Sequence, residues 1–185
     1  MERAVRDFLD ALELKDGGSG AAGETDATPE RVARAWADDL LSGYSIDPTA
    51  EVTWSEAPEG VGPVLVRSIG FASICVHHLL PFHGRAHVAY LPATRLAGLS
   101  KIGRVVDAWS RRLQTQENLT ARIVRTLAET LEPRGVIALL EAEHTCMTLR
   151  GVRKEQSRMT TVATAGLWAD DAGARAEVLQ LLRPN

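Results

Sequence analysis

The chain has 185 residues, of which 45% are hydrophobic and 24% charged, and its formal net charge is −3. This composition is close to that of soluble globular domains and excludes an extensively disordered chain. The net charge gives no electrostatic reason to expect non-specific binding of nucleic acid. No apolar run approaches the length of a membrane span and the charged, amphipathic start differs from a signal peptide, so we expect a cytoplasmic protein that does not enter a membrane.

The first 45 residues are predicted to form a helical arm. Apolar residues repeat at helical spacing over residues 2–14, and the Gly-rich stretch 16–25 is expected to end that helix. A second helix is predicted to begin with Thr28 as N-cap and Pro29 in the first turn, and to end near Gly43.

Residues 46–185 are predicted to form a single α+β domain. The expected elements, in chain order, are strands at 62–71 and 84–91, helices at 101–113 and about 119–131, strands at 136–150 and 158–168, and a helix at 174–182. Strands that follow one another without an intervening helix indicate antiparallel pairing rather than an alternating parallel sheet.

The two cysteines are the first candidates for chemistry. Cys75 precedes His77 and His78 between the first two predicted strands, and Cys146 follows His144 in the third. In a reducing compartment a structural disulfide is not expected, so the cysteines are either buried thiols or metal ligands. Strand alternation would place His144 and Cys146 on one face if the strand runs unbent to residue 150.

A zinc site is one interpretation of these residues. Cys75 and His78 have Cys-x-x-His spacing, and Cys146 would be a third ligand, which leaves a fourth position open as in catalytic zinc sites. His77 and His144 would remain as nearby proton donors or acceptors. The alternative is two unrelated buried thiols, because free cysteines often pack as small hydrophobic residues. Spacing alone gives the two interpretations similar weight.

Two further motifs are candidates for substrate binding. Ser100, Lys101 and Arg104 lie near a predicted helix start, where cations and free backbone amides suit a phosphate, although a solvated basic face is the commoner explanation. Gln116 and Glu117 carry an amide and a carboxylate that can bind the edge of a base such as guanine. A polar helix start is again the commoner explanation.

Together these motifs resemble one family. The blocks CVHHLLPFHGRAHVAYLP, GLSKIGRVVDAWSRRLQTQENLT and EAEHTCMTLRGV resemble, in order and separation, the signature blocks of GTP cyclohydrolase I. TPERVARAW and the closing GLW resemble its outer blocks. The resemblance extends from about residue 4 to residue 168, and this combination of motifs is highly specific.

The resemblance implies a tunnelling (T-) fold, in which antiparallel sheets with paired helices assemble into a barrel ring. Two pentameric rings would form a homodecamer with active sites at subunit interfaces. It also implies a hydrolase of pterin biosynthesis that opens the imidazole ring of GTP at C8, releases formate and forms 7,8-dihydroneopterin triphosphate.

Residue roles follow from the same resemblance. It implies that Cys75, His78 and Cys146 hold Zn²⁺, whose bound water attacks C8, that His144 protonates N7, and that His77 assists ring opening. Guanine would be bound by Gln116 and Glu117. Ribose and triphosphate would be held by Ser100, Lys101, Arg104 and Arg150, with Arg31 as a weaker candidate. Clustered cations suit a substrate with about four negative charges in an acidic protein.

Two positions depart from the family pattern. Val76 stands where glutamate is usual, and Val162 with Ala163 where a Thr-Ser pair is usual. Loss of a carboxylate beside a metal can alter hydrogen bonds to its ligands. Three alternatives therefore stay open: a paralogue with an altered product or an early-released ring-opened intermediate, a T-fold relative such as a nitrile reductase that uses cysteine and a nicotinamide cofactor, and an inactive regulatory ring subunit.

Overall fold

The structure is a computed structural model that describes residues 1–12 and 26–182. The chain separates into two compact units, Met1–Ser42 and Gly43–Asn185. The Gly-rich stretch expected at residues 16–25 lies outside the described residues. Among the helices that are described, none combines the length and the apolar character that crossing a bilayer requires.

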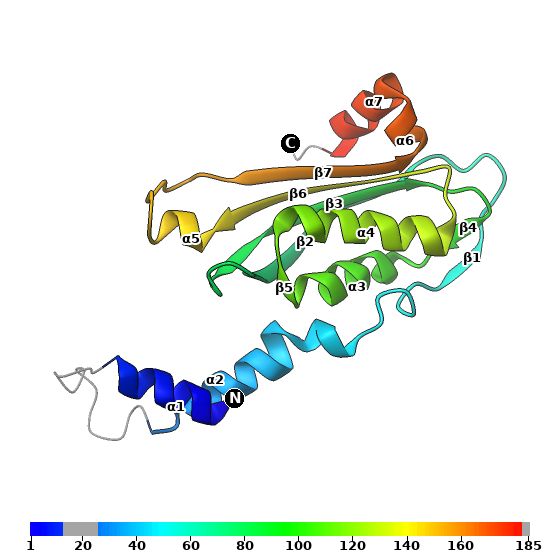
Figure 1. The fold of residues 1–185 in the computed structure, drawn as a ribbon. Coiled ribbons are helices and arrows are strands. Elements are labelled where there is room, and N and C mark those ends of the chain that lie inside the picture. Colours follow the sequence, from blue (N-terminus) through cyan, green and yellow to red (C-terminus); the bar gives the residue numbers. More distant parts are fainter. Residues whose placement is uncertain (13–25, 183–185) are drawn as a thin grey trace. The chain divides into compact units, whose positions relative to one another are not determined.

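The N-terminal unit is helical. Helix α1 (Glu2–Ala11) packs against α2 (Thr28–Arg34), which continues into a π-helical segment (Ala35–Leu40); a 3-10 turn (Ser42–Ser45) follows along the chain. The helices therefore occupy much of the stretch that was expected to be a helical arm (Figure 1).

The start of α2 differs by one residue from the expectation. Thr28 is already helical and Ala27 is the N-cap, so the prediction that Thr28 caps the helix is wrong. The physical reason is that the backbone of Ala27 already has right-handed helical torsion angles. Pro29 lies in the first turn as predicted, where its missing N–H costs no hydrogen bond.

A five-stranded sheet is the framework of the second unit (Figure 1). Its members are β2 (Val64–Cys75), β3 (Pro81–Leu91), β5 (Leu113–Gln114), β6 (Gly135–His144) and β7 (Met159–Gly166). They lie in the order β5-β2-β3-β6-β7. The four long strands pair antiparallel with their neighbours, whereas β5 runs parallel to the end of β2.

Two helices cover one face of this sheet. Helices α3 (Leu99–Ser110) and α4 (Gln116–Leu131) lie side by side on it, and the main core forms between helices and strands. Its largest fully buried side chains include Phe82, Tyr90, Ile102, Leu119, Ile123, Leu127, Leu131 and Leu140. The predicted mixed α+β class is confirmed, because alternating residues of the strands meet the apolar stripes of both helices.

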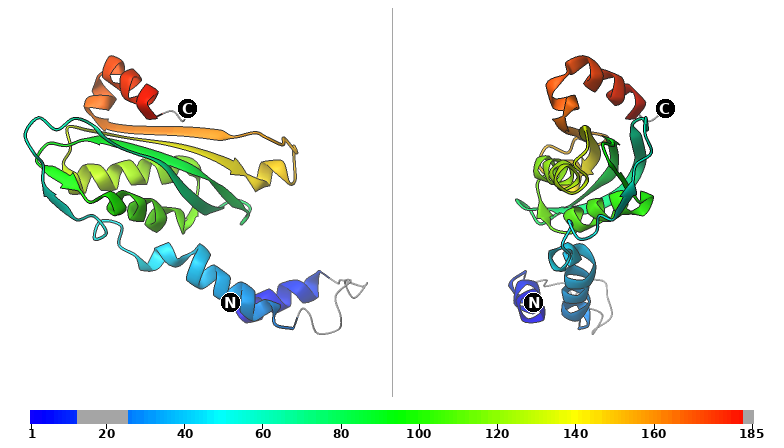
Figure 2. Two further views of the ribbon diagram at one scale, coloured as in Figure 1. Left: turned by 180° about the vertical axis from the view of Figure 1, so that it is seen from behind. Right: turned by 90° about the vertical axis from the view of Figure 1, so that its right-hand side faces the viewer.

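The opposite face is covered at one end only. Helices α6 (Leu167–Asp170) and α7 (Ala172–Leu182) lie there (Figures 1 and 2). They form a second, smaller core, whose buried members are Ala89, Ile137, Trp168, Val178 and Leu182. Strand alternation explains the division, since Ala89 and Ile137 point away from the face that carries α3 and α4.

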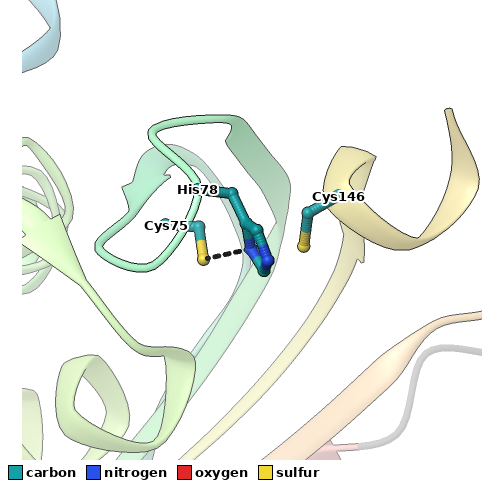
Figure 3. A group of neighbouring side chains, drawn as sticks. All are labelled: Cys75, His78 and Cys146. Carbon is teal, nitrogen blue, oxygen red and sulfur yellow. Dashed lines mark hydrogen bonds between the residues drawn. The ribbon is translucent and has the colours of Figure 1, made fainter. Parts of the chain in front are cut away.

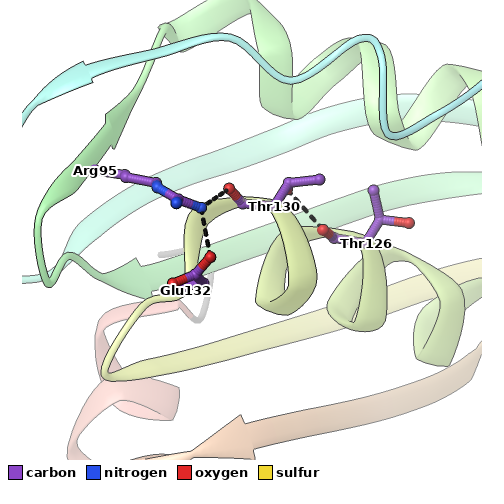
Figure 4. Close-up of polar contacts among 4 residues, drawn as sticks. All are labelled: Arg95, Thr126, Thr130 and Glu132. Carbon is purple, nitrogen blue, oxygen red and sulfur yellow. Dashed lines mark hydrogen bonds and ion pairs between the residues drawn. The ribbon is translucent and has the colours of Figure 1, made fainter.

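A small second sheet closes the C-terminal end of α4. It pairs β1 (Trp54–Glu56) with β4 (Arg95–Ala97), two strands that the sequence pattern did not predict. The Arg95 guanidinium donates to the Thr130 carbonyl at 2.9 Å and to the Glu132 carboxylate at 2.8 Å (Figure 4). Because Thr130 is in the last turn of α4, Arg95 satisfies a carbonyl that the helix leaves open.

The strand predicted over residues 136–150 is too long. β6 ends at His144, and Thr145–Thr148 form the short helix α5. The partner strand explains the end: β3 pairs as far as Phe82 opposite His144, and the next residue, Pro81, has no N–H to extend the ladder. Instead, the Thr145 hydroxyl donates to the Pro81 carbonyl at 2.6 Å.

Candidate metal centre and catalytic site

The turn between β2 and β3 carries two of the predicted ligands. Cys75 ends β2, its N–H donates to the Leu80 carbonyl, and its carbonyl accepts from the Leu79 N–H, each at 2.9 Å. Leu79 adopts a left-handed backbone conformation with φ of 54°. The turn folds the imidazoles back, so that Nδ1 of His78 lies 3.7 Å and Nδ1 of His77 3.9 Å from the Cys75 sulfur.

Cys146 reaches the same place from α5. The sulfur atoms of Cys75 and Cys146 and a ring nitrogen of His78 all lie within 4.8 Å of one another (Figure 3). The expected alignment of Cys146 with His144 by strand alternation is wrong, because His144 ends the strand and Cys146 belongs to the following helical turn. Cys146 therefore reaches Cys75 and His78 because β6 ends at His144, not because the strand continues.

The chemistry of the three donors suits a soft divalent metal. Cys75 is buried, Cys146 half-buried and His78 exposed, so the group lies at the surface end of the sheet. Burial raises the pKa of the Cys146 thiol, and the nearby Cys75 thiol raises it further, whereas Arg150 lowers it. Two neighbouring thiolates repel each other, and a cation between the sulfurs would offset this repulsion. Two thiolates and one imidazole are ligands that zinc prefers. These residues can therefore hold a metal and leave a coordination position open.

His144 lies beside this group in a well-defined setting. Its ring stacks on Phe82, with centroids 4.5 Å apart and planes 3° from parallel. Its Nε2 is 2.8 Å from Oε1 of Gln116. Burial lowers the pKa of His144, and the Glu117 carboxylate acts in the opposite direction.

The side chain of Gln116, a predicted base contact, is hydrogen-bonded to other groups of the chain. Its side chain is fully buried, and its amide nitrogen donates to protein acceptors on β6 and β7 while its amide oxygen meets His144. Both ends of the amide therefore already have protein partners. Glu117, the next residue, is exposed and retains both carboxylate oxygens for a ligand.

The proposed phosphate-binding residues lie at the other end of the sheet from the cysteines. Ser100, Lys101 and Arg104 are in the first turns of α3, next to β4, and Arg104 contacts the Glu51 carboxylate at 3.4 Å. The opposite end of α3 leads into β5, which pairs with the end of β2 at Cys75. From Ser100 to Ser110, the last residue of α3, the helix rises by about 15 Å.

The two remaining cationic candidates belong to other elements of the chain. Arg150 is exposed and follows α5 in the chain. It lies close enough to Cys146 to lower the pKa of that thiol. Arg31 is exposed on α2 in the N-terminal unit. The structure thus brings together Cys75, His78 and Cys146 with His77 and His144 close by, and does not bring Ser100, Lys101 or Arg104 to them within one chain.

Sequence reasoning missed the residues that support His144. Phe82 stacks under its ring, and Thr120 and Thr161 belong to the hydrogen-bond network around Gln116. Phe82 lies just outside the strand predicted at 84–91, and its place opposite His144 comes from the register of β3 with β6. Thr161 had no signal in the sequence, since it meets Gln116 only through the packing of α4 on β7, whereas Thr120 lies one turn after Gln116 in the same helix.

The end of a strand, a tight turn and a short helix bring two thiols and an imidazole together beside the half-buried His144. They define a potential metal-binding site in a mixed α+β fold. Comparison with known families places the chain: it belongs to the GTP cyclohydrolase I family, whose model matches residues 1–183.

Relatives from several bacteria agree with this membership. GTP cyclohydrolase 1 of Bacillus subtilis is 44% identical over 99% of this chain and 94% of its own length. The protein of the same name from Deinococcus radiodurans is 48% identical over 84% of this chain and 72% of its own length, and that of Geobacillus kaustophilus 45% identical over 99% and 95%. Archaeosine synthase QueF-Like superposes with a TM-score of 0.49 at 15% identity, covering 58% of this chain and 97% of that one, which is too weak a likeness to decide fold or function.

Proposed function

We propose that the protein is a zinc-dependent GTP cyclohydrolase I, which hydrolyses the guanine imidazole ring of GTP at C8, releases formate and forms 7,8-dihydroneopterin triphosphate. The observation that carries this proposal is the convergence of Cys75, His78 and Cys146 in a chain that matches the family over residues 1–183. The family membership supplies the reaction, and the donor group supplies the means for it.

Zinc held by Cys75, His78 and Cys146 would act as a Lewis acid that activates water for attack on a poor electrophile. The remaining work falls to side chains of the chain itself. His144 would carry the proton exchanged with N7 of guanine, and its ring is held by Phe82 for that purpose. His77, with its ring close to Cys75, would transfer the proton that ring opening requires.

Guanine recognition would fall to Glu117. Its exposed carboxylate can accept two parallel hydrogen bonds from the N1–H and amino group of guanine, a charge-assisted pattern that adenine does not offer. Its position directly after the buried Gln116, at the start of α4, places it near His144, whose pKa it raises. The base would then be bound next to the group that exchanges its proton.

The ribose and triphosphate would be bound by Ser100, Lys101, Arg104 and Arg150, with Arg31 as a further candidate. Because the first three lie at the far end of the sheet from the cysteines, one GTP can use both sets only if neighbouring chains supply them. We therefore propose a homo-oligomer with interfacial sites, a homodecamer of two pentameric rings.

The sheet supports such an assembly. Among the described strands, β7 pairs on one side only, and most of β2 has β3 as its single partner, so both long edges offer free backbone groups to another chain. We propose that these edges join in a T-fold barrel. Residues 46–185 would be the catalytic domain, and residues 1–45 an arm that contributes to the assembly.

The test is direct. Zinc-loaded protein is incubated with GTP, and both formate and the fluorescence of oxidised pterin are followed. Equal amounts of formate and pterin are expected. Formate without pterin would indicate a paralogue that stops after ring opening, and a lack of formate from any purine nucleotide would refute the proposal.

A further inference from the structure

The amide of Gln116 is held in one orientation by its surroundings. Gln116 is 0% exposed, and its Nε2 lies 3.1 Å from the Leu140 carbonyl, 3.0 Å from the Met159 carbonyl and 3.1 Å from the Thr161 hydroxyl. Carbonyl oxygens only accept hydrogen bonds, so the atom facing them must be the NH₂ group. The flipped amide would bring its oxygen against two carbonyl oxygens in a buried site, at a large cost in free energy.

The hydroxyls beside the amide agree with this orientation. The Thr120 hydroxyl donates to the backbone carbonyl of Gln116 at 2.7 Å. The Thr161 hydroxyl, 2.6 Å from that of Thr120, must then donate to it, which leaves a lone pair of Thr161 for the Gln116 NH₂ group. The two hydroxyl protons therefore each have one consistent place, and the two N–H groups of the amide serve three acceptors.

The orientation of the amide determines the tautomer of His144. Oε1 of Gln116 faces Nε2 of His144 at 2.8 Å, and an amide oxygen can only accept. Nε2 must therefore carry a proton. In the neutral ring Nδ1 is then the nitrogen without a proton, and no described residue makes a hydrogen bond to it. The stack on Phe82, 3° from parallel, holds the plane of the ring, so that Nε2 stays directed at Gln116.

We propose that Gln116 is a positioning residue, which locks His144 in the Nε2–H tautomer so that Nδ1 is the atom that exchanges a proton with the substrate. When the imidazolium gives its Nδ1 proton to N7 of guanine, it returns to the neutral Nε2–H form without breaking its bond to Gln116. This catalytic meaning rests on the proposed function, whereas the tautomer itself does not.

Neutron diffraction from deuterium-exchanged crystals of the zinc-loaded protein tests the tautomer. At about pH 8, where an ordinary imidazole is neutral, deuterium is expected on Nε2 of His144 and none on Nδ1. Deuterium on Nδ1 alone would overturn the proposal. Because this readout needs no turnover, it stands even if the protein fails to convert GTP, in which case only the proposed function is refuted.

Kinetics separate positioning from base binding. In Gln116→Met, which keeps the volume but removes every hydrogen bond of the side-chain amide, kcat for formate release is expected to fall roughly 10- to 100-fold, the scale of a misplaced catalytic group, with KM for GTP and zinc content unchanged. A raised KM with unchanged kcat would overturn the proposal and restore the direct guanine contact.

A second set of variants covers the case in which Gln116→Met does not fold. Thr161→Val removes one acceptor of the NH₂ group and is expected to lower kcat by a smaller factor, whereas Thr161→Ser keeps the hydroxyl and should restore it. Thr160→Val, one residue away on the exposed side of β7, is the matched control and should leave kcat unchanged. Equal kcat in Thr161→Val, Thr160→Val and the parent protein would contradict the proposal.

Discussion

The two ends of α4 carry similar polar side chains but leave different groups free. At the C-terminal end, Arg95 bonds to Thr130 and Glu132, and the Thr130 hydroxyl donates to the Thr126 carbonyl at 2.7 Å (Figure 4). These bonds satisfy one another and close the helix. The bonded groups there all have partners within the chain.

The N-terminal end of α4 has the opposite outcome. Gln116 is fully satisfied, but its bonds orient His144, whose other ring nitrogen stays available, and Glu117 next to it is exposed. The comparison teaches that polar residues at one helix end can stabilise the fold while those at the other prepare a site. The two ends of α4 differ because only the N-terminal end leaves a fixed polar atom, Nδ1 of His144, without a partner among the described residues.

Substitution of the proposed metal ligands, which lie near the N-terminal end of α4, should have the largest effect of all. Cys75→Ser and Cys146→Ser should each remove most of the bound zinc. A Lewis acid contributes several kcal/mol to transition-state stabilisation, so formate release should fall roughly 10³-fold or more. Metal content per chain is measured by mass spectrometry beside the activity assay. His83→Ala, on an exposed residue of β3, should retain both, and full activity of a zinc-free serine variant would contradict the assignment.

Glu117 should be the next most sensitive position. Glu117→Gln removes a charged hydrogen-bond acceptor worth about 1.5–3 kcal/mol, so kcat/KM for GTP should fall roughly 10- to 100-fold. Glu129→Gln, an exposed carboxylate near the other end of the same helix, is the matched control and should have no effect. If both variants lowered kcat/KM equally, the two ends of α4 would not differ as proposed.

Arg95 should affect stability rather than catalysis. Arg95→Met removes the bonds to the Thr130 carbonyl and to Glu132, which should lower the free energy of unfolding by about 1–2 kcal/mol. Urea unfolding measures this, with Arg125→Met on the exposed side of α4 as control. A loss of kcat without a loss of stability would reverse the contrast between the ends.

His87 provides the smallest expected effect, in the middle of the sheet. Burial lowers its pKa; Arg67 and Arg85 act in the same direction and Glu141 in the opposite one. Its Nδ1 accepts from the Ser68 N–H at 3.4 Å, a bond that the neutral ring can make and the doubly protonated ring cannot.

Below about pH 6.5 the unfolded chain takes up a proton that folded His87 does not, and stability must fall with decreasing pH by at most about 1.4 kcal/mol per pH unit from this group. His87→Gln keeps an acceptor but cannot titrate. Its urea-derived free energy of unfolding should therefore decrease less between pH 7 and pH 5.5 than that of the parent protein. Identical pH slopes would show that His87 gains its proton in the folded state.

Much of the site could be read from local sequence. Cys75 and His78 are three residues apart between two strand-like stretches, and a tight turn is enough to bring a sulfur and an imidazole nitrogen together. The mixed α+β class followed from the order of helical and strand periodicities, because apolar spacing reports which face of an element is buried. The short strands β1, β4 and β5 gave no such signal, since two or three residues are too few to show a period.

The rest depended on how distant segments meet. Cys146 joins the group because Pro81 ends the pairing of β3 with β6, so that the chain turns into α5 at that point. Gln116 looked like a surface residue at a helix start, and only the packing of α4 on β6 and β7 buried its amide and directed its oxygen to His144. Residue types and short spacings establish which donor atoms are available, but burial and hydrogen-bond direction arise from contacts between segments far apart in the chain, which local periodicity does not encode.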